Sequence, residues 1–131
     1  MRFVDTSFWI ALQTSSDHNH NAARALAEAG LGPVLTTNHV IGEVWTFTCR
    51  KRGHAGAVAS IREVRAVPTL TIVHVDPEEE ADAWRWLNRR GEREYSFIDA
   101  TSFAVMRRRR MREALAFDGD FSAAGFVELR P

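Results

Sequence analysis

Short apolar segments alternate along the chain with longer segments in which apolar residues recur every three or four positions. The short segments predict strands at residues 2–4, 33–37, 70–75, 114–117 and 126–129. The longer segments predict helices at residues 8–13, 17–30, 38–53, 55–66, 77–91 and 96–110. Strands separated by helices of about 10–15 residues are typical of an α/β fold, with a mainly parallel sheet covered by helices on both faces.

Residues at the ends of these segments indicate where several helices start and stop. Thr6 or Ser7 suits the N-cap of the first helix, and Asp17 suits that of the second, which Gly30 would end. Pro77 suits the first turn of its helix, and the three glutamates after it suit the positive end of the helix dipole. We therefore expect helix boundaries near these residues.

Composition narrows the class of protein. A chain of 131 residues has the length of a single domain, residues 1–131, and its 45% of hydrophobic residues argues against disorder. The 17 basic and 17 acidic residues balance, so bulk charge predicts attraction neither to nucleic acid nor to an acidic membrane. No apolar segment is long enough to span a bilayer, and Asp5 interrupts the N-terminal segment too early for a secretion signal. We expect a cytoplasmic protein.

Three aspartates lie where strands end or helices begin. Asp5 follows the first strand, Asp118 follows the fourth, and Asp99 lies three residues after Ser96. Each has a local explanation: Asp5 suits a helix N-cap, Ser96 and Asp99 suit a capping box, and Asp118 suits an Asp-Gly turn. Ligands of parallel sheets bind beyond the carboxyl ends of the strands, which gives the same residues a possible functional role.

Glu43 has no comparable local explanation. Its helix carries an apolar stripe that includes Val40, Val44 and Phe47. At 100° per residue, Glu43 lies about 40° from Phe47 and about 60° from Val40, on the margin of the stripe. Burial of a lone carboxylate is unfavourable by several kcal/mol unless something neutralises it. A bound cation would do so.

Four acidic side chains at one end of a sheet predict a metal site. Carboxylates without cysteine or clustered histidine select a hard ion, Mg²⁺ or Mn²⁺. Such an ion suits hydrolysis of a phosphodiester, because it polarises the phosphoryl oxygen and activates water.

The segments that carry these acids resemble the motifs of a known family. FVDTSFWIAL, TTNHVIGEVW, SFIDATSFAVM and ALAFDGDFSAAGF are similar, in order and spacing, to the four acidic motifs of PIN-domain ribonucleases, above all the VapC toxins of bacterial toxin–antitoxin pairs. The resemblance covers nearly the whole chain. It implies a PIN-like three-layer α/β/α sandwich and a metal site at Asp5, Glu43, Asp99 and Asp118. Asp120 matches a position that is acidic in some members only, which implies an auxiliary role.

The resemblance also implies a substrate and partners. NHVIGEVWT and EREYSFIDATSFAVMR are similar to the VapC subgroup that cuts the sarcin–ricin loop of large-subunit rRNA, with tRNA as the main competing substrate. Family members pair with a VapB-type antitoxin that blocks the site, and they form homodimers. A DNA nuclease and a catalytically silent PIN-fold module that binds RNA or protein remain as alternatives.

Two other Mg²⁺-binding folds do not fit. A response-regulator receiver domain needs an adjacent acidic pair after an early strand and a lysine after a late one, whereas Asp5 has no acidic neighbour and Lys51 lies mid-chain. A phosphatase of the haloacid-dehalogenase type needs D-x-D after the first strand, and the chain has DTS there.

The run of four arginines at residues 107–110 has two interpretations. Cations are favourable at the C-terminus of a helix, so the run suits a solvated helix end. It also suits contact with RNA phosphates, to which Arg89, Arg90 and Arg93 could add.

Overall fold

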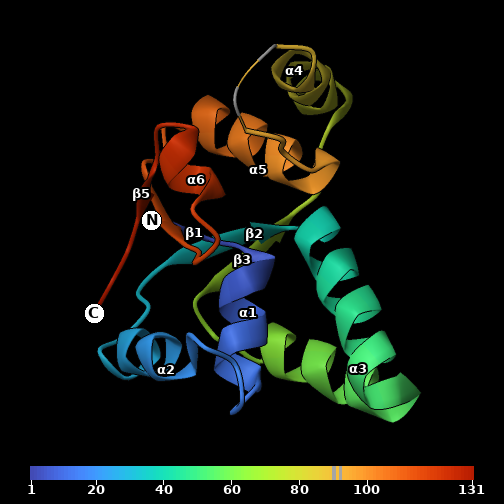
Figure 1. The fold of residues 1–131 in the computed structure, drawn as a ribbon, viewed down its shortest axis with the longest axis vertical. Helices are drawn as coiled ribbons and strands as arrows, with labels where there is room; N and C mark the ends of the chain where they lie inside the picture. Colours follow the sequence, from blue (N-terminus) through green and yellow to red (C-terminus); the bar gives the residue numbers. More distant parts are fainter. Residues whose placement is uncertain (90, 92) are drawn as a thin grey trace.

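A computed structural model, which describes residues 1–89, 91 and 93–131, contains five parallel strands in one sheet (Figure 1). The predicted α/β fold with a parallel sheet is therefore confirmed. Arg90 lies outside the described residues. The strands, in the spatial order β3-β2-β1-β4-β5, are β1 (Arg2–Val4), β2 (Val34–Thr37), β3 (Leu70–Val73), β4 (Glu113–Leu115) and β5 (Val127–Glu128).

The chain reverses its direction across the sheet at the pair β1–β4. From β1 the chain proceeds through β2 to β3 on one side, and β4 and β5 then add to the other side. Phe3 pairs with Ala114 and Val4 with Leu115 in this central pair. Ligands of open α/β sheets bind beyond the carboxyl ends of the strands at such a reversal point. Asp5 and Asp118 follow these two strands.

Helices cover both faces of the sheet (Figure 1). On one side are α1 (Thr6–Gln13), α2 (His20–Glu28) and the C-terminal half of α3 (Asn38–Arg65); on the other are α4 (Pro77–Leu87), α5 (Phe97–Arg108) and α6 (Asp120–Ala123). The predicted three-layer α/β/α arrangement is thus confirmed. Its largest fully buried side chains are Trp9, Phe3, Phe8, Phe103, Phe121, Met106 and Leu115.

The long helix α3 consists of two helical segments. Gly53 interrupts it with a φ of 77°, a left-handed conformation that glycine adopts without strain. The two separate helices predicted on either side of residue 54 therefore correspond to its two segments. Neither α3 nor any other described helix is long and apolar enough to cross a membrane.

Two predicted helix starts were wrong. Helix α1 begins at Thr6, and its N-cap is Asp5, as the local interpretation of that residue predicted, in place of Thr6 or Ser7. Helix α2 begins at His20 instead of Asp17, because the Asp17 carboxylate accepts a hydrogen bond from the Asn19 N–H at 2.8 Å and closes a turn before the helix. Both differences follow from the ability of aspartate to bond a backbone N–H two residues ahead.

The four-residue helix α6 was not predicted. Gly119 precedes it with a φ of 82°, and Asp120 is its first residue. A single helical turn is too short to show the periodicity by which longer helices are recognised. The turn predicted around Gly119 is present.

Phe47 does not belong to the core, contrary to the prediction. Val40 and Val44 are fully buried, whereas 39% of the surface of Phe47 is exposed. The apolar stripe of α3 is therefore narrower than its sequence indicates, and Phe47 lines an open cavity described below.

The arginine run lies at the exposed end of α5, yet three of its side chains contact the protein itself. Arg107 lies over the ring of Trp86, with 5.2 Å between the guanidinium carbon and the ring centroid. Arg108 pairs with Glu78 and Asp82 of α4. Arg109 pairs with Glu79 of the same helix. The run therefore helps to hold α4 against α5.

Arg109→Gln should lower the free energy of unfolding by about 2–3 kcal/mol, because it leaves the buried Glu79 carboxylate without its partner. This loss of stability should be smaller than the largest losses known for broken buried ion pairs, since 35% of the Arg109 side chain is exposed to water. Arg110→Gln is the matched control and should be neutral. Urea unfolding followed by circular dichroism measures both, and equal stabilities would show that the Glu79 pair contributes nothing.

Candidate active site

All four predicted acids line one cavity of about 1010 Å³ at the reversal point of the sheet. Asp5 follows β1, Glu43 projects from the first half of α3, Asp99 from the first turn of α5, and Asp118 from the loop after β4. The convergence predicted from strand ends is therefore present in the structure. The roles of these residues as metal ligands stay predictions.

Ser7 positions the Asp5 carboxylate and connects it to the segment that follows β4. Its backbone N–H and its hydroxyl both donate to Asp5 Oδ2, at 3.2 and 2.7 Å. The same hydroxyl oxygen accepts a hydrogen bond from the Phe117 N–H at 3.0 Å. Asp5 thus acts as the helix cap that local sequence suggests, and it also lines the cavity. Of the two hydroxyls that follow Asp5, Ser7 carries this network.

Asp99 likewise combines its local role with a place in the cavity. Its Oδ2 accepts from the Ser96 N–H at 3.1 Å, and its own N–H donates to Ser96 Oγ at 3.0 Å. This capping box fixes the side chain at the start of α5, where only 9% of the residue is exposed. A capping role and a functional role are therefore compatible, because a carboxylate has further lone pairs.

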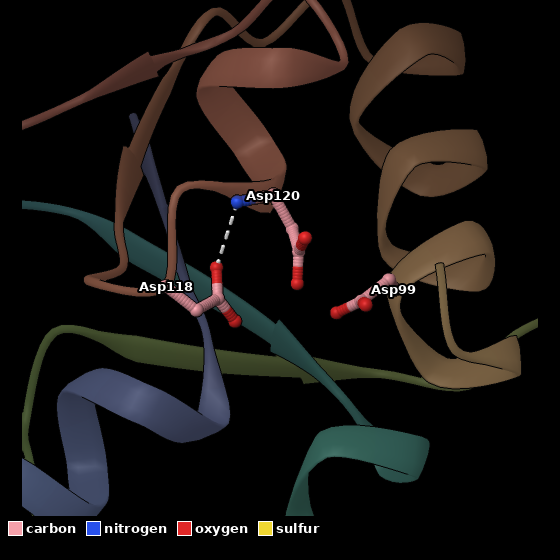
Figure 2. Close-up of side chains that lie close together, drawn as sticks. All are labelled: Asp99, Asp118 and Asp120. Carbon is pink, nitrogen blue, oxygen red and sulfur yellow. Dashed lines mark hydrogen bonds between the residues drawn. The ribbon is translucent and has the colours of Figure 1, made fainter. Parts of the chain in front are cut away.

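Three aspartates form the tightest acidic group among the described residues. Asp99, Asp118 and Asp120 each place one carboxylate oxygen within 4.8 Å of the others (Figure 2). Asp118 Oδ1 accepts from the Asp120 N–H at 3.0 Å, and the left-handed Gly119 lets the backbone turn between the two. Asp120 was predicted as an auxiliary acid only, so the structure brings it closer to Asp99 and Asp118 than sequence reasoning required.

Arg93 is a site residue that sequence reasoning did not connect to the acids. Its Nε donates to Asp120 Oδ1 at 2.6 Å, and one terminal nitrogen donates to the Asp118 carbonyl at 2.9 Å. A Cβ atom at position 119 would lie 3.0 Å from the same terminal nitrogen, so Gly119 also provides space for the guanidinium. The contact joins segments about 27 residues apart, and no local pattern predicts it.

Glu43 is half-buried on the wall of the cavity, on the margin of the core as predicted. It is not one of the three acids in the tight group. Apolar side chains complete the walls beside it, among them Phe47, Phe97 and Phe117. The acids therefore lie in an open cavity whose walls are partly apolar.

Burial and mutual repulsion raise the pKa values of these acids. Desolvation, with the charge of Asp118 second, raises the pKa of Asp5 from 3.8 to about 7 despite the hydrogen bonds from Ser7. Desolvation also raises the pKa of Asp99 to about 6, and the charges of Asp120 and Asp118 add to it. Asp118 has a raised pKa for the same leading reason.

The donor set fits a hard divalent cation. The side chains available are carboxylates whose pKa values are raised first by burial and then by the charges of their neighbours, and a bound cation would favour their ionised forms. Soft ligands are absent from the acidic group in the described part of the chain. The site can therefore hold an ion of the Mg²⁺ or Mn²⁺ type between α5 and the β4–α6 loop.

Asp120→Asn should reduce cleavage of a nucleic acid substrate by about 10–100-fold, as loss of an outer partner of a metal site typically does. Stability should change by no more than about 0.5 kcal/mol, because the pair with Arg93 is partly exposed. Asp82→Asn changes an aspartate outside the cavity that pairs with Arg85 and Arg108, and it serves as the control for cleavage. Single-turnover rates at saturating Mg²⁺ measure the effect, and wild-type rates would restrict the metal site to the other acids.

Comparison with known proteins agrees with this geometry. Residues 2–127 match the PIN domain. Over 131 residues, the chain is 53% identical to the 23S rRNA-specific endonuclease VapC20 of Mycobacterium tuberculosis, in strains CDC 1551 and H37Rv, covering 100% of this chain and 99% of that protein. The crystal structure of VapC20 from the same organism, described as a sarcin–ricin loop cleaving toxin, superposes with a TM-score of 0.92 at 52% identity and with full coverage of both chains.

Proposed function

The chain belongs to the PIN domain family, and on that premise we propose that it is the toxin of a toxin–antitoxin pair, a metal-dependent endoribonuclease that cuts the sarcin–ricin loop of 23S rRNA. One observation carries the proposal. Four acids typical of the family line a single cavity, in a chain more than half identical over its full length to an endonuclease with that specificity.

The acidic residues of the cavity would have two roles in hydrolysis, as ligands of the metal ion and as an auxiliary acid. Asp5, Glu43, Asp99 and Asp118 would hold the ion, with Asp120 as an auxiliary acid. We propose Mg²⁺, with Mn²⁺ as a substitute, because both prefer oxygen ligands. When bound, such an ion polarises a phosphoryl oxygen and makes water a stronger acid.

The hydrogen bonds of the protein fix these groups before substrate arrives. Ser7 orients Asp5, and the capping box orients Asp99. Phe97 and Phe117 contribute apolar surface to the same cavity. Because the geometry is held by backbone contacts, little reorganisation is needed when the phosphodiester enters.

RNA-end mapping tests the proposal. Cells that express the protein should show new 5′ ends within the sarcin–ricin loop, and cells that express Asp5→Asn should not. Purified ribosomes and total tRNA form separate arms of the same experiment in vitro. New ends in tRNA alone would favour the tRNA-cleaving alternative, and no cleavage of either RNA would favour a catalytically silent binding module.

Family membership also leads us to propose two partners. A VapB-type antitoxin would block the acidic cavity, and a second copy of the chain would complete a homodimer. Light scattering of the toxin alone and with its antitoxin measures both assemblies.

A further inference from the structure

A second, open cavity of about 700 Å³ lies beside the acidic one and is lined by basic residues. Arg89, Arg93 and Arg107 are all exposed on its walls, together with the half-buried Trp86 and Tyr95. The guanidinium carbons of Arg89 and Arg107 lie 5.1 and 5.2 Å from the centroid of the Trp86 ring. Glu94 is the acidic residue of the lining, so three arginines outnumber one glutamate there, and two of the arginines lie against the Trp86 ring.

Two of these guanidinium groups keep donors free for an anion. Among the described residues, neither Arg89 nor Arg107 forms an ion pair with a carboxylate, in contrast to Arg108 and Arg109 of the same run. Arg107 donates only a long hydrogen bond, 3.4 Å, to the Ala124 carbonyl. A guanidinium that lies on an aromatic ring leaves N–H groups at its edge, and their fork matches a phosphate.

Arg93 connects the basic cavity to the acids. It lines the basic cavity, and its Nε donates to Asp120, whose carboxylate belongs to the tight acidic group. Asp99 and Asp118 of that group line the acidic cavity. The Arg93–Asp120 pair thus lies between the two cavities, so an RNA strand bound at the acids can continue past Arg93 into the basic cavity.

We propose that the basic cavity is a subsite for the phosphates that flank the scissile bond of the RNA strand. The inference rests on the proposed ribonuclease function. A chain of zero net charge attracts RNA only through a local group of cations, and the acids themselves repel it. The cavity recognises phosphate and not a base, because Arg89 and Arg107 already occupy the Trp86 ring.

Binding of a fluorescent sarcin–ricin hairpin RNA tests the subsite. In an Asp5→Asn background, where the RNA should stay intact, Arg89→Gln and Arg107→Gln should each weaken binding about tenfold at low salt. Each should also reduce the slope of log Kd against log salt by roughly 0.7–0.9, the value for one lost phosphate contact. In the otherwise active enzyme, Arg89→Gln should raise KM and leave kcat unchanged, because the contact is made equally in the ground and transition states.

Arg62→Gln is the matched control, an exposed arginine at the end of α3 on the opposite side of the sheet. It should leave Kd and the salt slope unchanged.

Arg107 also lies over the Phe126 ring, so Arg107→Gln could fail to fold. In that case the result for Arg89→Gln alone tests the subsite. If the wild-type protein cleaves the RNA but Arg89→Gln changes neither the affinity nor the salt slope, the phosphate subsite is wrong and the proposed ribonuclease function stands. The basic cavity would then be a candidate binding site for an acidic protein segment. A wild-type protein that neither binds nor cleaves the RNA would overturn the proposed function as well.

Discussion

Asp5→Asn and Asp99→Asn should each abolish cleavage of RNA while leaving the protein folded. Loss of an outer partner of a metal site already reduces activity by about 10–100-fold, so loss of a carboxylate that binds the ion should exceed that range. Both side chains line the acidic cavity, and both carry raised pKa values caused by burial and by neighbouring acids. The measurement is single-turnover cleavage of a sarcin–ricin hairpin RNA at saturating Mg²⁺.

The stability of these variants separates a functional role from a capping role. Asparagine is as good an N-cap as aspartate, so Asp5→Asn keeps the acceptor for the Ser7 N–H while it removes a charge from a crowded site. The metal-free variant should therefore be at least as stable as the wild-type protein. Asp76 caps α4 outside the cavity, and Asp76→Asn should preserve both cleavage and stability. Gross unfolding of Asp5→Asn would instead support a purely structural role for this residue.

The metal-free protein should be more stable at pH 5 than at pH 8. Asp5 has a pKa of about 7 in the folded protein, against 3.8 without the surrounding structure. Between these values the folded state holds a proton that the unfolded state has lost, so stability falls as the pH rises through 7. Each unit of difference in the pKa of a group corresponds to about 1.4 kcal/mol, and Asp99 contributes in the same direction with a pKa of about 6.

Magnesium should reverse this pH dependence. At pH 8 the carboxylates are ionised and can bind the ion, which stabilises the folded state in proportion to its occupancy. Urea midpoints at pH 5 and pH 8, in EDTA and in Mg²⁺, measure both effects. Asp5→Asn should lose most of the pH dependence in EDTA. A metal-free protein that gains stability as the pH rises would show that burial and neighbouring charges do not disfavour the ionised acids as the structure indicates.

The sheet and the acidic cavity could be predicted because their signals are local. Each strand is a short apolar segment, and parallel strands place their carboxyl ends together, so Asp5 and Asp118 had to meet if β1 and β4 were neighbours. Glu43 stood out by its angular position on one helix. The exposure of Phe47 was not predicted. The apolar stripe of α3 shows which side chains share one face of the helix, but not whether a side chain at the edge of that face packs in the core or lines a cavity.

The contacts that join distant segments could not be predicted. Arg93 meets Asp120 across about 27 residues, and Arg109 meets the buried Glu79 across about 30. The sequence around Glu79 indicated only the start of a helix, where an exposed glutamate is favourable. Such pairs depend on how α4 and α5 pack, and neither charge nor spacing along the chain determines that packing.

The hydrogen bond from the Phe117 N–H to Ser7 joins two parts of the chain 110 residues apart. Contacts of such long range form only when both segments are available, and chains are synthesised from the N-terminus. Asp5, which follows β1, therefore stays without Asp118 until β4 and the residues after it have been made. The acidic cavity therefore cannot be complete before the segment that follows β4 has been synthesised.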